Sequence, residues 1–206
     1  MRNENYRSWM NFTSNNHDGA LNTLYGRKGH VKGFVEMIDE RVRQGWHPHF
    51  LTLQFRQLPG KTRTVLDQMR NEVETLYRKI VSRVQRFPRT KLGSLNVPFL
   101  LGCADLPIPK HQKKTKAEVS INDGLHHHGI LLLPPNSRLR TDLKAHFDQE
   151  QKLYRRDSLL SSIFTEPIDE DIERVVGYAF KGVVSGRLDY DEAVVVLPRS
   201  VTELPE

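Results

Sequence analysis

The chain has 206 residues, with 31 Lys and Arg against 25 Asp and Glu, and its formal charge of +6 favours an anionic partner such as nucleic acid. Its apolar runs fall far short of the roughly 20 residues that cross a bilayer, so we expect no membrane partner. The single cysteine, Cys103, excludes an intrachain disulfide and a multi-cysteine zinc site. This cysteine usage and a polar N-terminus without a signal-peptide pattern indicate the cytoplasm.

The hydrophobic pattern predicts a poorly patterned arm over residues 1–28 and one domain over residues 29–206. Long connections and few strand–helix–strand units favour an α+β fold, with a central, largely antiparallel sheet of about five strands flanked by helices. In chain order we expect a helix over His30–Gln44, a strand over His49–Phe55, a helix over Thr62–Arg86, strands over Val97–Asp105 and Gly124–Leu133, a helix over Arg138–Tyr154, a strand over Ser158–Phe164, a helix over Pro167–Lys181 and a strand over Ala193–Leu197, with a further short strand open at Glu118–Ile121.

The segment GLHHHGILLLP, over Gly124–Pro134, carries the sharpest functional signal. Side chains alternate along a strand, so His126 and His128 share one face and His127 points to the other. Two imidazoles on a rigid strand form a two-ligand platform for a divalent metal. The alternative is a trio of partly exposed histidines without a ligand.

A second signal is VVGYAFKG, over Val175–Gly182, on the last predicted long helix. Tyr178 and Lys181 are three residues apart and would share one side of that helix. Tyr178 lies beside the apolar stripe rather than within it. A tyrosine with a cation one turn away suits a phenolate or a bound phosphate, whereas an ordinary boundary tyrosine beside a solvated lysine is the alternative.

Three segments occur in a fixed order along the chain: FLTLQF (Phe50–Phe55), HHHGILLL (His126–Leu133) and YAFK (Tyr178–Lys181). This order resembles the HUH endonucleases of the rolling-circle replication initiator type. Those enzymes carry a hydrophobic first strand, then His-hydrophobic-His on a central strand, then Tyr-x-x-Lys on a helix. Relaxases of the same superfamily place the tyrosine before the histidines. The chain departs from the pattern with His127 in the usually hydrophobic middle position and with a long basic segment before the histidines.

The resemblance implies a metal-dependent nickase that cleaves and rejoins single-stranded DNA at a specific sequence or structure. His126 and His128 would hold Mg²⁺ or Mn²⁺ against the scissile phosphate. Tyr178 would attack that phosphate and leave a 5′-phosphotyrosine, while Lys181 would position the phenol or contact the phosphate. Such a reaction would initiate rolling-circle replication or the transfer of a plasmid, phage or transposon, with a host helicase or polymerase as a further partner.

A third metal ligand is expected, because Mg²⁺ and Mn²⁺ prefer oxygen donors to an all-imidazole set. Initiators of this type often place an acidic residue on the strand before the histidine strand. In the segment FLLGCADLP that residue is Asp105. Glu118 and Asp123 are the alternatives.

Basic side chains gather in two places that suit the phosphates of a DNA strand. One is the segment Pro109–Lys116, and the other is the long helix over Thr62–Arg86. A solvated helix face is the alternative for the second. We expect DNA contacts from Lys110, Lys113, Lys114, Lys116, Arg83 and Arg86.

Other interpretations of the sequence stay open. HPHF, over His47–Phe50, is a second His-x-His with the spacing of a metal pair. PGKT, over Pro59–Thr62, has the end of a P-loop, but Phe55 stands where that motif needs glycine. A DNA-binding regulator without enzymatic activity would need only the basic helix and the basic segment.

Overall fold

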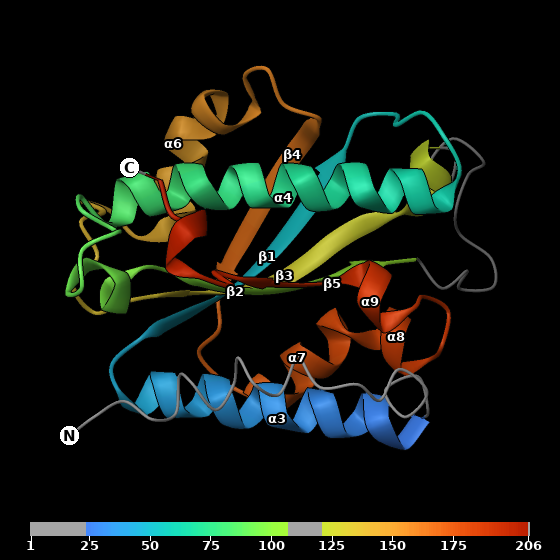
Figure 1. Cartoon of the computed structure of the whole chain (residues 1–206), viewed down its shortest axis with the longest axis horizontal. Coiled ribbons are helices and arrows are strands. Elements are labelled where there is room, and N and C mark those ends of the chain that lie inside the picture. Colours follow the sequence, from blue (N-terminus) through green and yellow to red (C-terminus); the bar gives the residue numbers. More distant parts are fainter. Residues whose placement is uncertain (1–23, 107–120, 206) are drawn as a thin grey trace.

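Five strands form one antiparallel sheet in the order β4-β1-β3-β2-β5 (Figure 1). The computed structural model describes residues 24–106 and 121–205 of the chain. His126 and His128 lie on β3, in the middle of the sheet, so the structure confirms the predicted α+β fold and the strand that carries the histidine pair. The strands are β1 (His47–Phe55), β2 (Phe99–Asp105), β3 (His126–Leu133), β4 (Leu160–Pro167) and β5 (Val194–Leu197).

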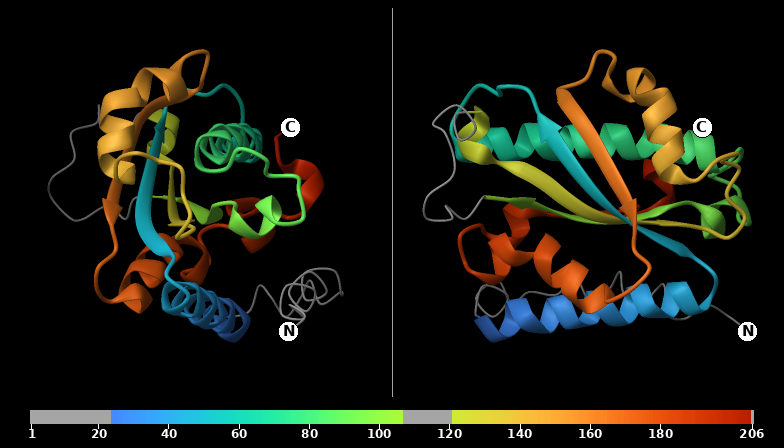
Figure 2. Two further views of the ribbon diagram at one scale, coloured as in Figure 1. Left: turned by 90° about the vertical axis from the view of Figure 1, so that its left-hand side faces the viewer. Right: turned by 180° about the vertical axis from the view of Figure 1, so that it is seen from behind.

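Helices cover both faces of this sheet (Figure 1, Figure 2). α4 and α6 lie over one face, and α3, α7 and α8 lie over the other. No helix in the described part of the chain is long and apolar enough to cross a membrane. The helices are α3 (Leu24–Arg43), α4 (Thr62–Val84), α6 (Leu143–Arg155), α7 (Ile172–Ala179), α8 (Lys181–Val184) and α9 (Tyr190–Ala193).

The alternation of apolar residues along β1 separates the two faces of the sheet. Leu51, Leu53 and Phe55 are buried, whereas Phe50 and Thr52 point to the opposite face and are partly exposed. Burying each large apolar side chain stabilises the fold by roughly 1.5–3 kcal/mol. The face of β1 towards α4 therefore belongs to the apolar core over the last five residues of the strand. The opposite face stays accessible to solvent beside Thr52.

The helix predicted over Pro167–Lys181 is two helices in the structure, and this prediction was wrong in its bounds. Pro167 ends β4, and α7 begins only after Asp171, whose side chain caps the helix by accepting a hydrogen bond from the Arg174 backbone N–H at 3.0 Å. The helix is interrupted at Phe180, whose backbone (φ −99°, ψ 9°) departs from helical geometry, and α8 starts at the next residue. Tyr178 and Lys181 therefore stand on either side of a break.

Two other helix starts differ from the prediction. α6 begins at Leu143 rather than Arg138, because the Asp142 carboxylate accepts a hydrogen bond from the Ala145 backbone N–H at 2.9 Å and caps the helix there. α3 begins at Leu24, so residues 24–28 of the predicted arm are helical. The remainder of the arm and most of the short strand predicted over Glu118–Ile121 lie outside the described residues. The division into an arm and a domain stays a prediction.

Candidate metal centre

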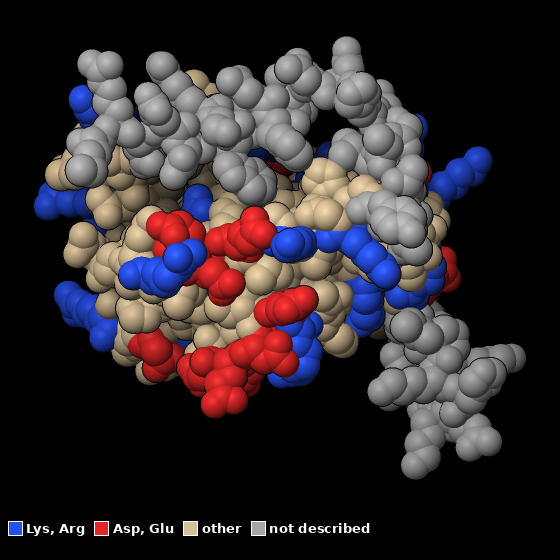
Figure 3. Space-filling view, turned by 90° about the horizontal axis from the view of Figure 1, so that it is seen from below, with Lys and Arg blue, Asp and Glu red and all other residues tan. Residues whose placement is uncertain are grey.

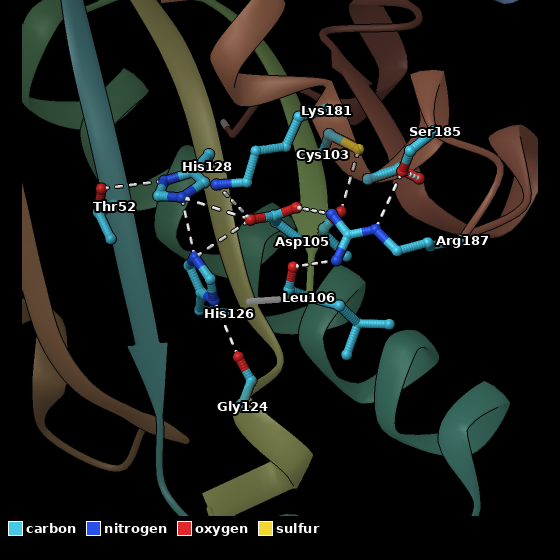
Figure 4. A network of polar contacts seen from close by, with 12 residues as sticks. Thr52, Cys103, Asp105, Leu106, Gly124, His126, His128, Lys181, Ser185 and Arg187 are labelled. Atoms are coloured by element: carbon cyan, nitrogen blue, oxygen red, sulfur yellow. Dashed lines mark hydrogen bonds and ion pairs between the residues drawn. The ribbon is translucent and has the colours of Figure 1, made fainter. Parts of the chain in front are cut away.

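Asp105, His126 and His128 bring one possible ligand atom each into a group in which all separations are within 4.8 Å (Figure 4). Strand pairing causes this, because Asp105 at the end of β2 lies opposite His126 in the β2–β3 register. Asp105 Oδ2 lies 3.6 Å from His126 Nε2 and 3.9 Å from His128 Nε2. Asp105, the first candidate from the sequence, is thus the carboxylate beside the histidines. Asp123 is not in the group, and Glu118 lies outside the described residues.

Hydrogen bonds orient both imidazoles towards one point. His126 Nδ1 donates to the Gly124 carbonyl at 2.9 Å, and His128 Nδ1 lies 3.1 Å from Thr52 Oγ1. A neutral ring that carries its proton on Nδ1 leaves a lone pair on Nε2, as a metal ligand requires. Burial, followed by the charges of His126 and Lys181, lowers the pKa of His128 to about 3, so this ring is neutral at pH 7.

The ligand geometry fits a metal ion. The two Nε2 atoms are 2.8 Å apart, which is also a hydrogen-bond distance. When both rings carry their protons on Nδ1, the two Nε2 lone pairs face each other, and a cation between them would remove their repulsion. Ligand atoms about 2.1 Å from a common ion are separated by roughly 3.0–3.4 Å. That value lies between the nitrogen–nitrogen separation and the longer nitrogen–oxygen separations to Asp105. Small side-chain shifts are enough to close the three ligands around an ion.

The Asp105 carboxylate is fully buried and faces two cations. Lys181 Nζ lies 2.8 Å from Oδ2, and Arg187 Nη2 lies 3.7 Å from Oδ1. Both contacts are ion pairs by distance, but neither oxygen has a hydrogen bond of good geometry among the described residues. Lone pairs of a buried carboxylate therefore stay available for a metal. Two cations against one carboxylate also leave the group electropositive, which suits a phosphate.

A glycine lets α8 approach the carboxylate. A Cβ atom at Gly182 would lie 3.0 Å from Asp105 Oδ1 and 3.4 Å from the Ala104 carbonyl oxygen. A side chain at this position would therefore crowd the Asp105 carboxylate, which would have to shift by a few tenths of an ångström. The close approach places Lys181, the first residue of α8, against Asp105.

Tyr178 lies at the open side of this group. Its side chain is 50% exposed, its ring centroid is 5.1 Å from that of His128, and Phe50 is 5.9 Å away on the same side. Lys181 Nζ lies 3.8 Å from the centroid of the Tyr178 ring, so the lysine contacts the aromatic face and Asp105 at the same time. The structure therefore joins the predicted tyrosine and lysine to the predicted histidines.

Tyr178 is the exposed one among the four tyrosine side chains that the structure describes. Tyr77 and Tyr154 are almost fully buried in the core. Burial raises the pKa of Tyr154 to about 12, and burial with the charge of Asp191 also raises the pKa of Tyr190. A buried phenol with a raised pKa is a poor nucleophile, which leaves Tyr178 as the candidate among these four.

The predicted DNA contacts that the structure describes do not lie near the metal group. Arg83 and Arg86 are exposed at the C-terminal end of α4, on the face of the sheet opposite α7 and α8 (Figure 1). Arg86 stacks on Phe87 at 5.1 Å. The predicted contacts at Lys110, Lys113, Lys114 and Lys116 lie outside the described residues.

The second His-x-His pair lies at the other end of β1. His49 Nδ1 is 3.1 Å from the His47 carbonyl oxygen, and burial lowers the pKa of His49. Both histidines line a cavity of about 650 Å³ together with Trp46 and Asp142. Within residues 24–106 and 121–205, Asp105, His126 and His128 form the one group of three possible ligands, so this cavity lacks a metal set.

The P-loop interpretation is wrong for this fold. A P-loop follows a strand of a parallel sheet, but β1 pairs antiparallel with both of its neighbours. Phe55, which stands at the glycine position of the motif, is packed in the core. The PGKT segment is an ordinary connection, in which Lys61 precedes the first turn of α4.

Sequence reasoning missed two residues of the group. Thr52 lies opposite His128 in the β1–β3 register, a signal that strand alternation offered only once the pairing was known. Arg187 follows α8, donates to the Leu106 carbonyl at 2.7 Å and to Ser185 Oγ at 3.0 Å, and so is held beside Asp105. No local pattern in the sequence marks this arginine.

Comparison of the chain with family models, curated proteins and solved structures finds no significant match. The resemblance to the HUH endonucleases therefore rests on the three ordered motifs alone.

Proposed function

We propose that the chain is a metal-dependent endonuclease and strand transferase that acts on single-stranded DNA. One observation carries this proposal. An exposed tyrosine lies beside a buried His–His–Asp group whose carboxylate also pairs with two basic side chains, Lys181 and Arg187. These are a nucleophile, a metal set and phosphate-binding charges in one place.

The proposed reaction is a transesterification at phosphorus. Tyr178 Oη attacks the scissile phosphate and loses its proton, the bond between phosphorus and O3′ breaks, and the departing O3′ takes up a proton. The products are a free 3′-hydroxyl end and a 5′-phosphate linked to the tyrosine. One ester bond replaces another, so the energy of the backbone bond is kept and the strand can be rejoined.

Asp105, His126 and His128 would hold the metal, which would stabilise negative charge on the phosphate oxygens. Two imidazoles and one carboxylate favour Mn²⁺ over Mg²⁺, which prefers an all-oxygen set. The same donor set also holds Fe²⁺ in oxygenases. Lys181 and Arg187 favour the phosphate chemistry, since they supply positive charge for an anionic substrate.

The order of the motifs supports a role as initiator rather than relaxase, because Tyr178 follows the histidines in the chain. The proposed setting is rolling-circle replication or transfer of a mobile element in the cytoplasm. A host helicase would unwind the nicked duplex.

The experiment that tests the proposal incubates the chain with a 5′-labelled and a 3′-labelled pool of single-stranded DNA and Mn²⁺. We expect the 3′-labelled fragment to become linked to protein, and peptide mapping to find it on Tyr178. Addition of EDTA should abolish the reaction, and Tyr178→Phe should bind DNA without forming the adduct. DNA attached to another tyrosine, or no adduct under any of these conditions, contradicts the proposal.

A further inference from the structure

An aromatic side chain lies exposed on the sheet beside the metal group. Phe164 on β4 is 55% exposed. In the strand register Phe164 lies opposite Thr52, and Thr52 lies opposite His128. Residues directly opposite each other in an antiparallel pair point to the same face. The three side chains therefore form one row across β4, β1 and β3, about 10 Å long over two strand spacings.

The neighbours of Phe164 confirm which way it points. Ile163 and Thr165 are buried, and they pair with Leu53 and Leu51 on the face that α4 and α6 cover. Phe164 points away from that face, to the side of Tyr178. Its exposure shows that α7 and α3, which cover the β3 side of this face, do not reach it.

A polar pair forms the next row of the same strip. Ser162 Oγ donates to Gln54 Oε1 at 2.8 Å, and these two residues are also register partners. This bond occupies the Oε1 atom of the exposed Gln54 amide and leaves its NH₂ group as the donor that a ligand could use. We call Phe164, Thr52, Gln54 and Ser162 the open strip. The nearest acidic residue along β4, Glu166, is paired with Lys144.

The surface on the other side of Tyr178 carries charges of both signs. Figure 3 shows acidic side chains gathered on the outer surface of α3 and the start of α7, with basic side chains among them. Lys32, Arg43 and Arg174 pair with Glu36, Glu40 and Asp171, so this surface offers a polyanion few unpaired cations. The exposed acidic residues of this surface are Glu36, Glu40, Asp169, Glu170, Asp171 and Glu173.

We propose that the open strip binds a nucleotide next to the scissile phosphate, with its base stacked on Phe164 and its edge contacted by the Gln54 amide. This inference rests on the proposed function and adds to it the surface that holds the substrate. Aromatic rings bind single-stranded DNA through base stacking because every base has a π-face, whereas a hydrogen-bond donor at the base edge discriminates among bases. Phe164 then contributes affinity for single-stranded DNA of any sequence, and Gln54 contributes a preference for particular bases.

The test uses the full chain with Tyr178→Phe, loaded with Mn²⁺, so that DNA binds without being cleaved. The probe is a fluorescein-labelled, mixed-sequence single-stranded oligonucleotide, read by anisotropy. We expect Phe164→Ala to weaken binding roughly 10-fold and Phe164→Trp to preserve it, since stacking is retained. Leu95→Ala is the matched control, because Leu95 is 54% exposed and lies just before β2, at the end of that strand opposite Asp105, and its removal should leave affinity unchanged.

A second arm isolates the base. The chain that keeps Phe164 should bind an oligonucleotide of abasic sites roughly 10-fold more weakly than the normal probe. In Phe164→Ala most of this difference between the two probes should disappear. Equal affinities for Phe164→Ala and Leu95→Ala would overturn the inference. So would a concentration-dependent dimer that Phe164→Ala dissolves, because β4 is an edge strand and Phe164 would then serve self-association.

The two proposals can fail separately. A covalent adduct on Tyr178 with unchanged DNA affinity in Phe164→Ala would keep the nuclease and reject the open strip. Weakened DNA affinity in Phe164→Ala without any adduct in the wild-type chain would keep the strip as a single-stranded DNA site and reject the nuclease. Absence of DNA binding by the wild-type chain rejects both.

Discussion

The two faces of β3 give neighbouring histidines opposite roles. His126 and His128 have hydrogen-bonded Nδ1 atoms and Nε2 atoms directed at Asp105. His127, between them, is 2% exposed on the face covered by α4, and neither of its ring nitrogens has a partner in the described part of the chain. The comparison shows that alternation alone separates two possible ligands from a histidine that fills core space.

This difference explains how a histidine can stand at position 127, where the HUH motif that the segment resembles has a hydrophobic residue. Burial, followed by the charges of His126 and Arg70, lowers the pKa of His127 to about 3, so the ring is neutral and packs as an aromatic core residue. Gly102 on β2 makes the room, because a Cβ there would lie 2.2 Å from His127 Cε1. A polar residue type thus occupies a core position, which is the kind of position that the HUH motif fills with a hydrophobic residue.

We expect the largest effect on Mn²⁺ affinity, which should depend on the face of β3 from which a histidine is removed. The double variant His126→Ala/His128→Ala should lose at least about 100-fold in Mn²⁺ affinity, because it leaves only one ligand. His127→Leu should bind Mn²⁺ as the wild type does, since its side chain lies on the other face. Isothermal titration calorimetry measures both variants. Equal losses in the two proteins would show that the faces are not distinct.

Gly102→Ala tests how the His127 ring packs on the core face of β3. The added methyl group would meet the His127 ring and destabilise the protein by about 1–3 kcal/mol. The second variant, Gly102→Ala/His127→Ala, should recover part of that loss, because the ring that clashes is gone. Urea unfolding measures the four proteins of this cycle. Additive losses would mean that the methyl group strains the backbone rather than the ring.

The low pKa of His127 predicts a specific acid sensitivity. The folded state holds this ring neutral down to about pH 3, while in the unfolded chain the ring binds a proton near its ordinary pKa of 6.5. As the pH falls from 6.5 towards 3, the unfolded state binds more protons and stability decreases by up to about 1.4 kcal/mol per pH unit for this residue. Because His128 also has a lowered pKa, His127→Leu should reduce this slope without abolishing it. Urea unfolding at pH 7 and pH 5 measures the slope, and an unchanged slope in His127→Leu contradicts the assignment.

The smallest effect concerns Lys181, which occupies the same carboxylate oxygen that the metal would use. Removing the lysine charge in Lys181→Met should tighten Mn²⁺ binding by about 10-fold or less, since a competing cation is lost. Arg70→Met is the control, because this arginine lies on α4, on the His127 face, and its contacts are to the Asp191 and Glu192 carbonyls. Weaker Mn²⁺ binding in Lys181→Met would show that the lysine supports the ligand set instead of competing with it.

The sequence by itself determined the local features of this protein. The hydrophobic pattern predicted the strand over Gly124–Leu133, and alternation along it placed His126 and His128 on one face and His127 on the other. These predictions succeeded because strand periodicity is a property of neighbouring residues. The order of the predicted elements also predicted the α+β class, since it held long connections and few strand–helix–strand units.

Only the tertiary structure decided which distant residues meet. The β2–β3 register placed Asp105 beside the histidines, and the β1–β3 register added Thr52. The break at Phe180 turned Lys181 onto Asp105 and the Tyr178 ring, although sequence spacing predicted one continuous helix. Register and helix packing depend on contacts between segments far apart in the chain, so local sequence patterns do not predict them. For that reason Arg187 and the open strip became visible only in the folded protein.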